Sequence, residues 1–173
     1  VFLIYQLSRR EVVGRYRGSM MGLLWSFASP LVMLAVYTFV FGTVFRVRWQ
    51  TGDGDTASFA LNLFAGVLLH AFLAECLNRS PALIAENTGY VKKVVFPLWI
   101  LPVVLVLAAL FHLLVGLLVL IVGAGVVQQQ VHAGVLLVPL LLLPFALLAL
   151  GLSWFIAALG VYLRDLAQVL PVV

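Results

Sequence analysis

Four long stretches without a charged residue constrain this sequence more than any other feature. They are Met20–Phe45, Phe59–Ala74, Val94–Val127 and Val131–Leu163. A helix needs about 20 apolar residues to cross the hydrocarbon core of a bilayer, within a range of about 17–25. The first, third and fourth stretches reach that length directly, and the second reaches it if Glu75–Asn78 lies at a membrane edge. The pattern predicts an all-α, polytopic membrane protein.

The composition excludes an ordinary soluble domain. Charged residues make up 9% of the chain and hydrophobic residues 65%, with a mean hydropathy of +1.21, whereas a soluble domain has about 25% charged residues. The net charge of +4 is better explained by charges that flank membrane spans than by a nucleic-acid partner. The single Cys76 cannot form an internal disulfide and is expected to be a small apolar filler.

The positions of lysine and arginine orient the chain. If the N-terminus lies in the cytoplasm, only Arg46 and Arg48 face outward. The other eight of the ten basic residues lie inside: Arg9, Arg10, Arg15, Arg17, Arg79, Lys92, Lys93 and Arg164. Because cytoplasmic flanks carry an excess of positive charge, this orientation is the expected one.

These patterns predict a single transmembrane domain over residues 1–173. We expect an interfacial helix at 1–18 and a cytoplasmic loop at 79–96. The membrane spans are expected at 20–45, 59–78, 97–123 and 135–163. The sequence ends in the apolar "LPVV", so we also expect the domain to be incomplete at its C-terminus.

The N-terminal segment is predicted to be an amphipathic helix in the cytoplasmic membrane interface. Helical spacing places Val12, Val13 and Tyr16 on one side. Most charged residues fall on the other side, although Arg9 intrudes on the apolar one: Arg10, Glu11, Arg15 and Arg17. An interfacial helix fits this pattern, and the alternative is an ordinary charged flank of the first span.

The cytoplasmic loop "NRSPALIAENTGYVKKVVF" carries the strongest local signal. Ser80 is predicted to cap a short helix with Pro81 at its first position, and Asn87 is a plausible stop. Leu83 and Ile84 would then face one way, with Glu86 and Asn87 facing another. The loop is either a plain connector anchored by its lysines or a docking surface for a cytoplasmic partner. After it, Pro97 fits a first helical turn and Pro102 is predicted to bend the helix.

The sequence shows no catalytic or metal-binding constellation. His70, His112 and His132 are far apart, and no His/Cys/Asp cluster has metal-ligand spacing. No Walker A loop is present, so this chain is not expected to bind ATP in that way. His70 and His112 are expected to be neutral and to bond neighbouring helices, although a functional role is open. Tyr37, Phe41 and Phe45 form an i, i+4, i+8 stripe, either packed in a core or lining a substrate route.

Three blocks together resemble a known family. They are "SRREVVGRYRGSMMGLLWSFASPLVMLAVYTFVFG", "NTGYVKKVVFPLWILP" and "GVYLRDLAQVLP". In this order they are similar to the ABC-2-type permeases of bacterial polysaccharide exporters, which serve O-antigen, capsule or teichoic acid export. The resemblance spans nearly the whole chain. It implies six membrane helices in the full protein, of which two follow the end of this sequence.

The resemblance also implies partners and sites. The permease would be a homodimer in the bacterial inner membrane, moving a lipid-linked glycan. ATP and Mg would be bound by a separate ATPase subunit, and this chain would bind no cofactor. A coupling helix at about 81–87 would dock that ATPase through Pro81, Leu83, Ile84, Glu86, Asn87, Tyr90, Lys92 and Lys93. Arginine suits diphosphate by bidentate hydrogen bonding, so the glycan's pyrophosphate, or simply anionic lipid heads, would meet Arg9, Arg10, Arg15 and Arg17.

Three other functions are considered. An ABC-2-type exporter of a drug or small lipid would share the fold, but the R-Y-R-G-S and F-P blocks favour the polysaccharide branch. An intramembrane glycosyltransferase or acyltransferase would need an acid or histidine cluster at the membrane face, which this sequence does not show. An ion channel would need charged rings or a filter loop, and the outer loops show neither. The chain is therefore expected to be a transport subunit and not an enzyme.

Overall fold

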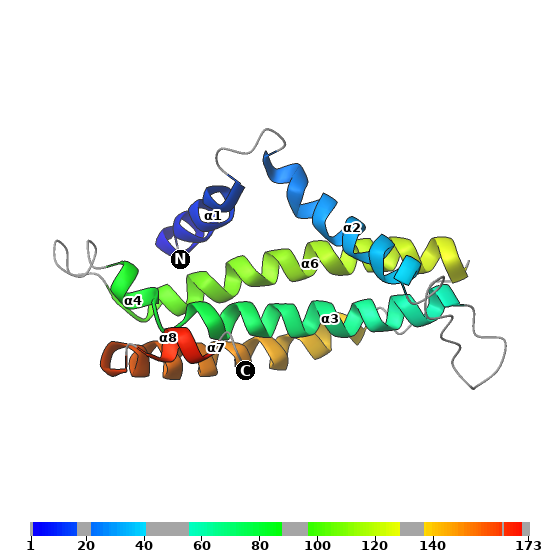
Figure 1. The fold of residues 1–173 in the computed structure, drawn as a ribbon. Coiled ribbons are helices and arrows are strands. Elements are labelled where there is room, and N and C mark those ends of the chain that lie inside the picture. The colour runs from blue at the N-terminus through cyan, green and yellow to red at the C-terminus, as the bar shows by residue number, and fades with distance from the viewer. Residues whose placement is uncertain are drawn as a thin grey trace. The chain divides into compact units, whose positions relative to one another are not determined.

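The fold is known from a computed structural model that describes residues 2–16, 22–40, 56–87, 97–128, 137–163 and 165–170. Within these ranges the regular structure is entirely helical (Figure 1), which confirms the predicted fold class. The elements in chain order are α1 (Phe2–Tyr16), the 3₁₀ helix η1 (Gly22–Leu24), α2 (Trp25–Phe39), α3 (Thr56–Arg79), α4 (Leu83–Glu86), α6 (Ile100–Gln128), α7 (Val138–Tyr162) and α8 (Leu166–Val169).

Three of these helices are long and apolar enough to cross a membrane: within α3, α6 and α7, the candidate spans are Phe59–Arg79, Ile100–Val126 and Val138–Tyr162. The fourth apolar helix, α2, has 15 residues in the described part of the chain. The chain is therefore a multi-pass helical membrane protein. Residues 20–21 and 41–45 of the predicted first span lie outside the described ranges.

The helices group into two compact units. The first contains Val1–Arg15, Ala71–Phe111 and Pro139–Val173, and the second contains Tyr16–His70 and His112–Val138. The long helices α3 and α6 contribute one segment to each unit.

In the first unit, α7 packs through a face of small residues. Ala149, Ser153, Ala157 and Gly160 are buried and follow one another at intervals of three or four residues. A Cβ added at Gly160 would lie 2.6 Å from the Cα of Pro81, so the backbones approach closely here, as small side chains allow between membrane helices. Phe72 of α3 also meets Phe145 of α7, with ring centroids 5.5 Å apart.

In the second unit, α3 packs on α6. The side chain of Leu68 covers Gly116, where an added Cβ would lie 2.5 Å from its Cδ2 atom. Further along both helices, a Cβ added at Gly123 would lie 3.4 Å from the Cδ2 atom of Leu61. Phe64 is almost fully buried in this unit. Glycine on α6 thus provides the room that leucine on α3 occupies.

Candidate functional site

The connection from α3 to α4 is built differently from the sequence prediction. Ser80 does not cap α4: its hydroxyl donates to the carbonyl oxygen of Cys76 at 2.5 Å. Ala82 holds the N-cap position without a side-chain hydrogen bond, and α4 starts at Leu83. The predicted cap was wrong because serine in the last turn of a helix can bond back to the carbonyl four residues earlier, and α3 continues to Arg79.

The short helix α4 is anchored on its inner side. Leu83 is buried in one cluster with Leu101 and Leu105 of α6, and Pro81 is buried against Gly160. At the other end, the side-chain amide of Asn87 donates to the carbonyl oxygen of Leu83 at 2.8 Å, and Asn87 is the C-cap that the sequence predicted. The helix is therefore packed against α6 and α7 at its start and closed by its own hydrogen bond at its end.

The residues that were predicted to dock the ATPase differ in how deeply they are buried. Pro81 and Leu83 lie inside the first unit and offer no surface to a partner in this structure. Ile84 and Asn87 are half-buried, and Glu86 is exposed. The remaining three residues of the set, Tyr90, Lys92 and Lys93, lie outside the described residues. Docking through α4 stays a prediction for its outer residues.

Pro97 and Pro102 lie on either side of the first residue of α6. The helix begins at Ile100, whose amide bonds the carbonyl of Pro97 at 3.1 Å. Pro97 therefore precedes the helix rather than occupying its first turn. Pro102 is the third helical residue, where the missing N–H is one that every helix leaves without an internal partner. The bend predicted at Pro102 is thus not required by its position. Trp154 of α7 secures this end by donating from Nε1 to the carbonyl oxygen of Trp99 at 3.0 Å.

Helix α1 has a half-buried side and an exposed side. Ile4, Leu7, Glu11 and Val12 are half-buried, whereas Val13 is exposed. The sequence prediction grouped Val13 with Val12 and placed Glu11 on the outer side. Glu11 lies on the covered side because it pairs with Arg79 of α3. The predicted membrane-facing side of α1, with Val12, Val13 and Tyr16, stays a prediction.

Four charged side chains join α1 to α3 in the first unit. Arg79 Nη2 donates to Glu11 Oε1 at 2.5 Å, and Arg15 forms an ion pair with Glu75. Arg79 Nη1 also lies 3.8 Å from Glu75 Oε1. We call these four residues the α1–α3 charge network. Sequence reasoning missed it, although the signal was present as an acid and a base four residues apart on each helix.

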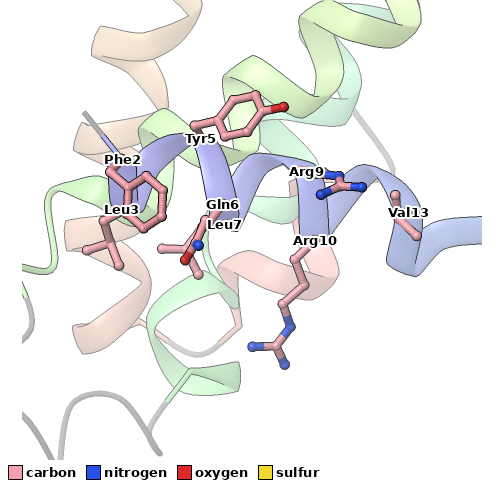
Figure 2. A pocket seen from close by; sticks show the side chains of 8 residues that line it. All are labelled: Phe2, Leu3, Tyr5, Gln6, Leu7, Arg9, Arg10 and Val13. Carbon is pink, nitrogen blue, oxygen red and sulfur yellow. The ribbon is translucent and has the colours of Figure 1, made fainter.

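The network separates the four arginines that were predicted to meet a pyrophosphate. Arg15 is engaged by Glu75, and Arg17 lies outside the described residues. Arg9 and Arg10 are exposed and line an open hollow of about 740 Å³ on the outer face of α1. Figure 2 shows Phe2 and Tyr5 toward the start of α1 and Arg9 and Arg10 further along it, with Arg10 pointing to the other side of the helix from Tyr5. Aromatic and arginine side chains on one helix are typical of a membrane interface.

The remaining predicted residues lie elsewhere. Tyr37 on α2 is half-buried, while Phe41 and Phe45 lie outside the described residues, so the aromatic stripe stays a prediction. His112 stacks on Tyr16, with ring centroids 5.8 Å apart. His70 is exposed on α3. Among the side chains that the structure describes, no group of three or more His, Cys, Asp or Glu residues could hold a metal ion.

The architecture is that of a helical membrane protein with a short anchored helix between two spans, and the family comparison agrees with it. The chain matches the family described as "ABC-2 type transporter" over residues 3–173. This chain belongs to that family. The resemblance seen in the sequence is thereby confirmed.

Three proteins that are similar to this chain carry the same name. The chain is similar to the O-antigen export system permease protein RfbA of Myxococcus xanthus, at 28% identity over 167 residues that cover 96% of this chain and 62% of that protein. Two Klebsiella pneumoniae proteins of the same name are 27% and 26% identical over the same shares. The chain thus spans 62% of the length of these relatives.

Proposed function

We propose that this chain is part of the permease subunit of an ATP-driven exporter that moves a lipid-linked polysaccharide across the bacterial inner membrane. The observation that carries the proposal is the ABC-2 transporter match over residues 3–173, together with relatives named as O-antigen export permeases. In this proposal two copies of the permease form the route. A separate ATPase subunit binds ATP and Mg, and the substrate enters from the cytoplasmic side.

The proposed orientation places the N-terminus in the cytoplasm. Eight of the ten basic residues then lie on the cytoplasmic side. The exposed face of α1 would lie in the membrane interface, with Phe2 and Tyr5 at the level of the lipid heads and Arg9 reaching phosphate.

Helix α4 is the proposed contact for the ATPase. Leu83 fixes it to α6 through Leu101 and Leu105, and Pro81 fixes its entry against α7. Because buried packing resists gradual deformation, a displacement of α4 would be passed to the spans that hold it. An ATPase that contacts α4 differently in its ATP-bound and ATP-free states would shift the permease between two conformations.

The arginines on the outer face of α1 are the proposed contact for the glycan's pyrophosphate. Arg9 and Arg10 are exposed and line the same hollow. A guanidinium group can bind two phosphate oxygens at once through two parallel hydrogen bonds. Arg15 is assigned a different role, because Glu75 already occupies its guanidinium group.

The proposal is tested by affinity purification of the full-length permease from its native membrane. The wild type is expected to retain a soluble ATPase. Glu86→Lys, which reverses an exposed charge on α4, is expected to lower the retained ATPase by about tenfold or more, as loss of a charged interfacial contact costs about 2 kcal/mol.

Two further variants provide controls for the purification. Gln168→Lys adds a positive charge at an exposed site on α8 and is expected to retain the ATPase. Leu83→Ala empties a core position and is expected to lower the unfolding temperature, whereas Glu86→Lys leaves it unchanged. Recovery of the wild type without any ATPase would refute the proposal.

A further inference from the structure

One face of α3 carries polar and small residues along the first half of a candidate membrane span. Asn62, Gly66 and His70 follow one another at four-residue intervals and are all exposed. At about 100° per residue, four residues advance the helix by little more than a turn, so the three lie within about 80° of each other. All three belong to the second unit. We call them the α3 polar stripe.

The opposite side of α3 makes the packing contacts of that unit. Leu61 and Leu68 face Gly123 and Gly116 of α6, and Phe64 is almost fully buried. An added Cβ at Gly66 would meet nothing within 4 Å. The stripe is therefore turned away from the helix that α3 packs against, and the space beside it is open.

Such a face is unfavourable against lipid. His70 lies near the middle of the candidate span Phe59–Arg79, and polar side chains at that depth face a protein interior or a water-filled cavity. Two other polar side chains in the apolar helices have partners within the chain. His112 stacks on Tyr16, and the hydroxyl of Thr38 donates to the carbonyl oxygen of Leu34 at 2.8 Å.

We propose that the α3 polar stripe lines the hydrated route along which the sugar hydroxyls of the substrate pass. This inference rests on the proposed function. The amide of Asn62 and the imidazole of His70 offer hydrogen-bonding groups that suit sugar hydroxyls, which both donate and accept. Neither residue of this pair carries the fixed charge that would hold a passing substrate tightly, and a conducting site must bind weakly enough to release. Gly66 between them leaves room for the chain of sugars.

The test is cysteine labelling of the full-length protein in its native membrane. Cys76 is buried, and the labelling of the wild-type protein is measured as the baseline. Asn62→Cys, Gly66→Cys and His70→Cys are treated with a membrane-impermeant, water-soluble thiol reagent. Leu118→Cys and Val122→Cys are the controls, because these positions are 54% and 58% exposed on the apolar helix α6 of the same unit.

Modification of the stripe cysteines at least about tenfold faster than the controls supports the proposal, since the reactive thiolate forms only where water is present. Equal, slow labelling at all five positions overturns it.

A second measurement separates this inference from the proposed function. Modification of His70→Cys with a bulky reagent is expected to block glycan export, and the same modification at Leu118→Cys is expected to leave it unchanged. If the wild type exports glycan and the modified His70→Cys protein does so equally well, the stripe inference fails alone. If the wild type exports no glycan, the proposed function fails.

Discussion

Glu11 and Arg15 stand one turn apart on α1, and Glu75 and Arg79 stand one turn apart on α3. The shortest contacts run between the helices: Glu11 with Arg79 and Arg15 with Glu75. The order of the pairs is antiparallel, so both form only when the two helix segments lie in one register. The chain has 10 basic and 6 acidic residues, and four of them form the contacts that fix this register.

The network predicts energetic coupling between Glu11 and Arg79. Their side chains are 35% and 37% exposed, so the expected coupling free energy is about 1 kcal/mol, at the upper end for solvent-accessible pairs. The measurement is a double-mutant cycle of Glu11→Gln and Arg79→Gln, followed by thermal unfolding in detergent. As a control, Arg9→Gln combined with Arg79→Gln should give additive losses. Additive losses for Glu11 and Arg79 as well would contradict the network.

The same geometry predicts different outcomes for two arginines. Arg9→Ala is expected to weaken binding of a diphosphate-bearing lipid by about tenfold, because one charge-assisted contact contributes about 1.5–3 kcal/mol, without changing the unfolding temperature. Arg15→Ala is expected to lower the unfolding temperature instead, because it leaves Glu75 without this partner. Thermal unfolding and lipid binding measured on both variants decide the assignment. It is incorrect if Arg9→Ala destabilises the protein or Arg15→Ala alone weakens lipid binding.

The sequence could not distinguish these arginines. Helical spacing placed Arg15 on a polar face, but Glu75 is 60 residues away, and periodicity within one helix gives no information about a partner on another. Ser80 was predicted as a cap from its neighbour Pro81, whereas its hydroxyl bonds back to Cys76 in the last turn of α3, because serine can serve either role at such a position.

At the scale of the helices, length and apolarity were sufficient to predict the long elements. α3, α6 and α7 extend over Thr56–Arg79, Ile100–Gln128 and Val138–Tyr162, where the sequence had predicted spans at 59–78, 97–123 and 135–163. The packing faces were not predictable in this way. On α7, Ala149, Ser153, Ala157 and Gly160 are buried, and at Gly160 the backbone of Pro81 comes close. That neighbour is not visible in the sequence of α7 itself.

The close approach at Gly160 predicts a specific sensitivity. Gly160→Ala would place a methyl group 2.6 Å from the Cα of Pro81, so one helix must shift, and we expect a loss of about 1–3 kcal/mol. Gly151→Ala on the same helix is the matched control, since its added Cβ meets nothing within 4 Å. It should be neutral or slightly stabilising, because alanine favours helix over glycine. Equal unfolding temperatures for the two variants would show that Gly160 is not a close contact.

At the scale of the whole molecule, α4 and the charge network belong to the first unit, while the α3 polar stripe belongs to the second. The proposed ATPase contact and the proposed route are thus carried by different parts of the chain, and α3 contributes to both units. A conformational change that starts at α4 has a continuous helix through which it can reach the stripe. This assignment of roles is a hypothesis that follows from the proposed function.

The central claim is that the full-length permease exports a lipid-linked polysaccharide with energy from a separate ATPase. The most direct test is reconstitution of the permease and its co-purified ATPase into vesicles that contain the lipid-linked glycan. Transfer of the glycan across the vesicle membrane is measured with and without ATP and Mg. We predict transfer that requires both ATP and the ATPase and that stops when the ATPase cannot hydrolyse ATP. Transfer that proceeds equally without ATP, or without the ATPase, would contradict the account.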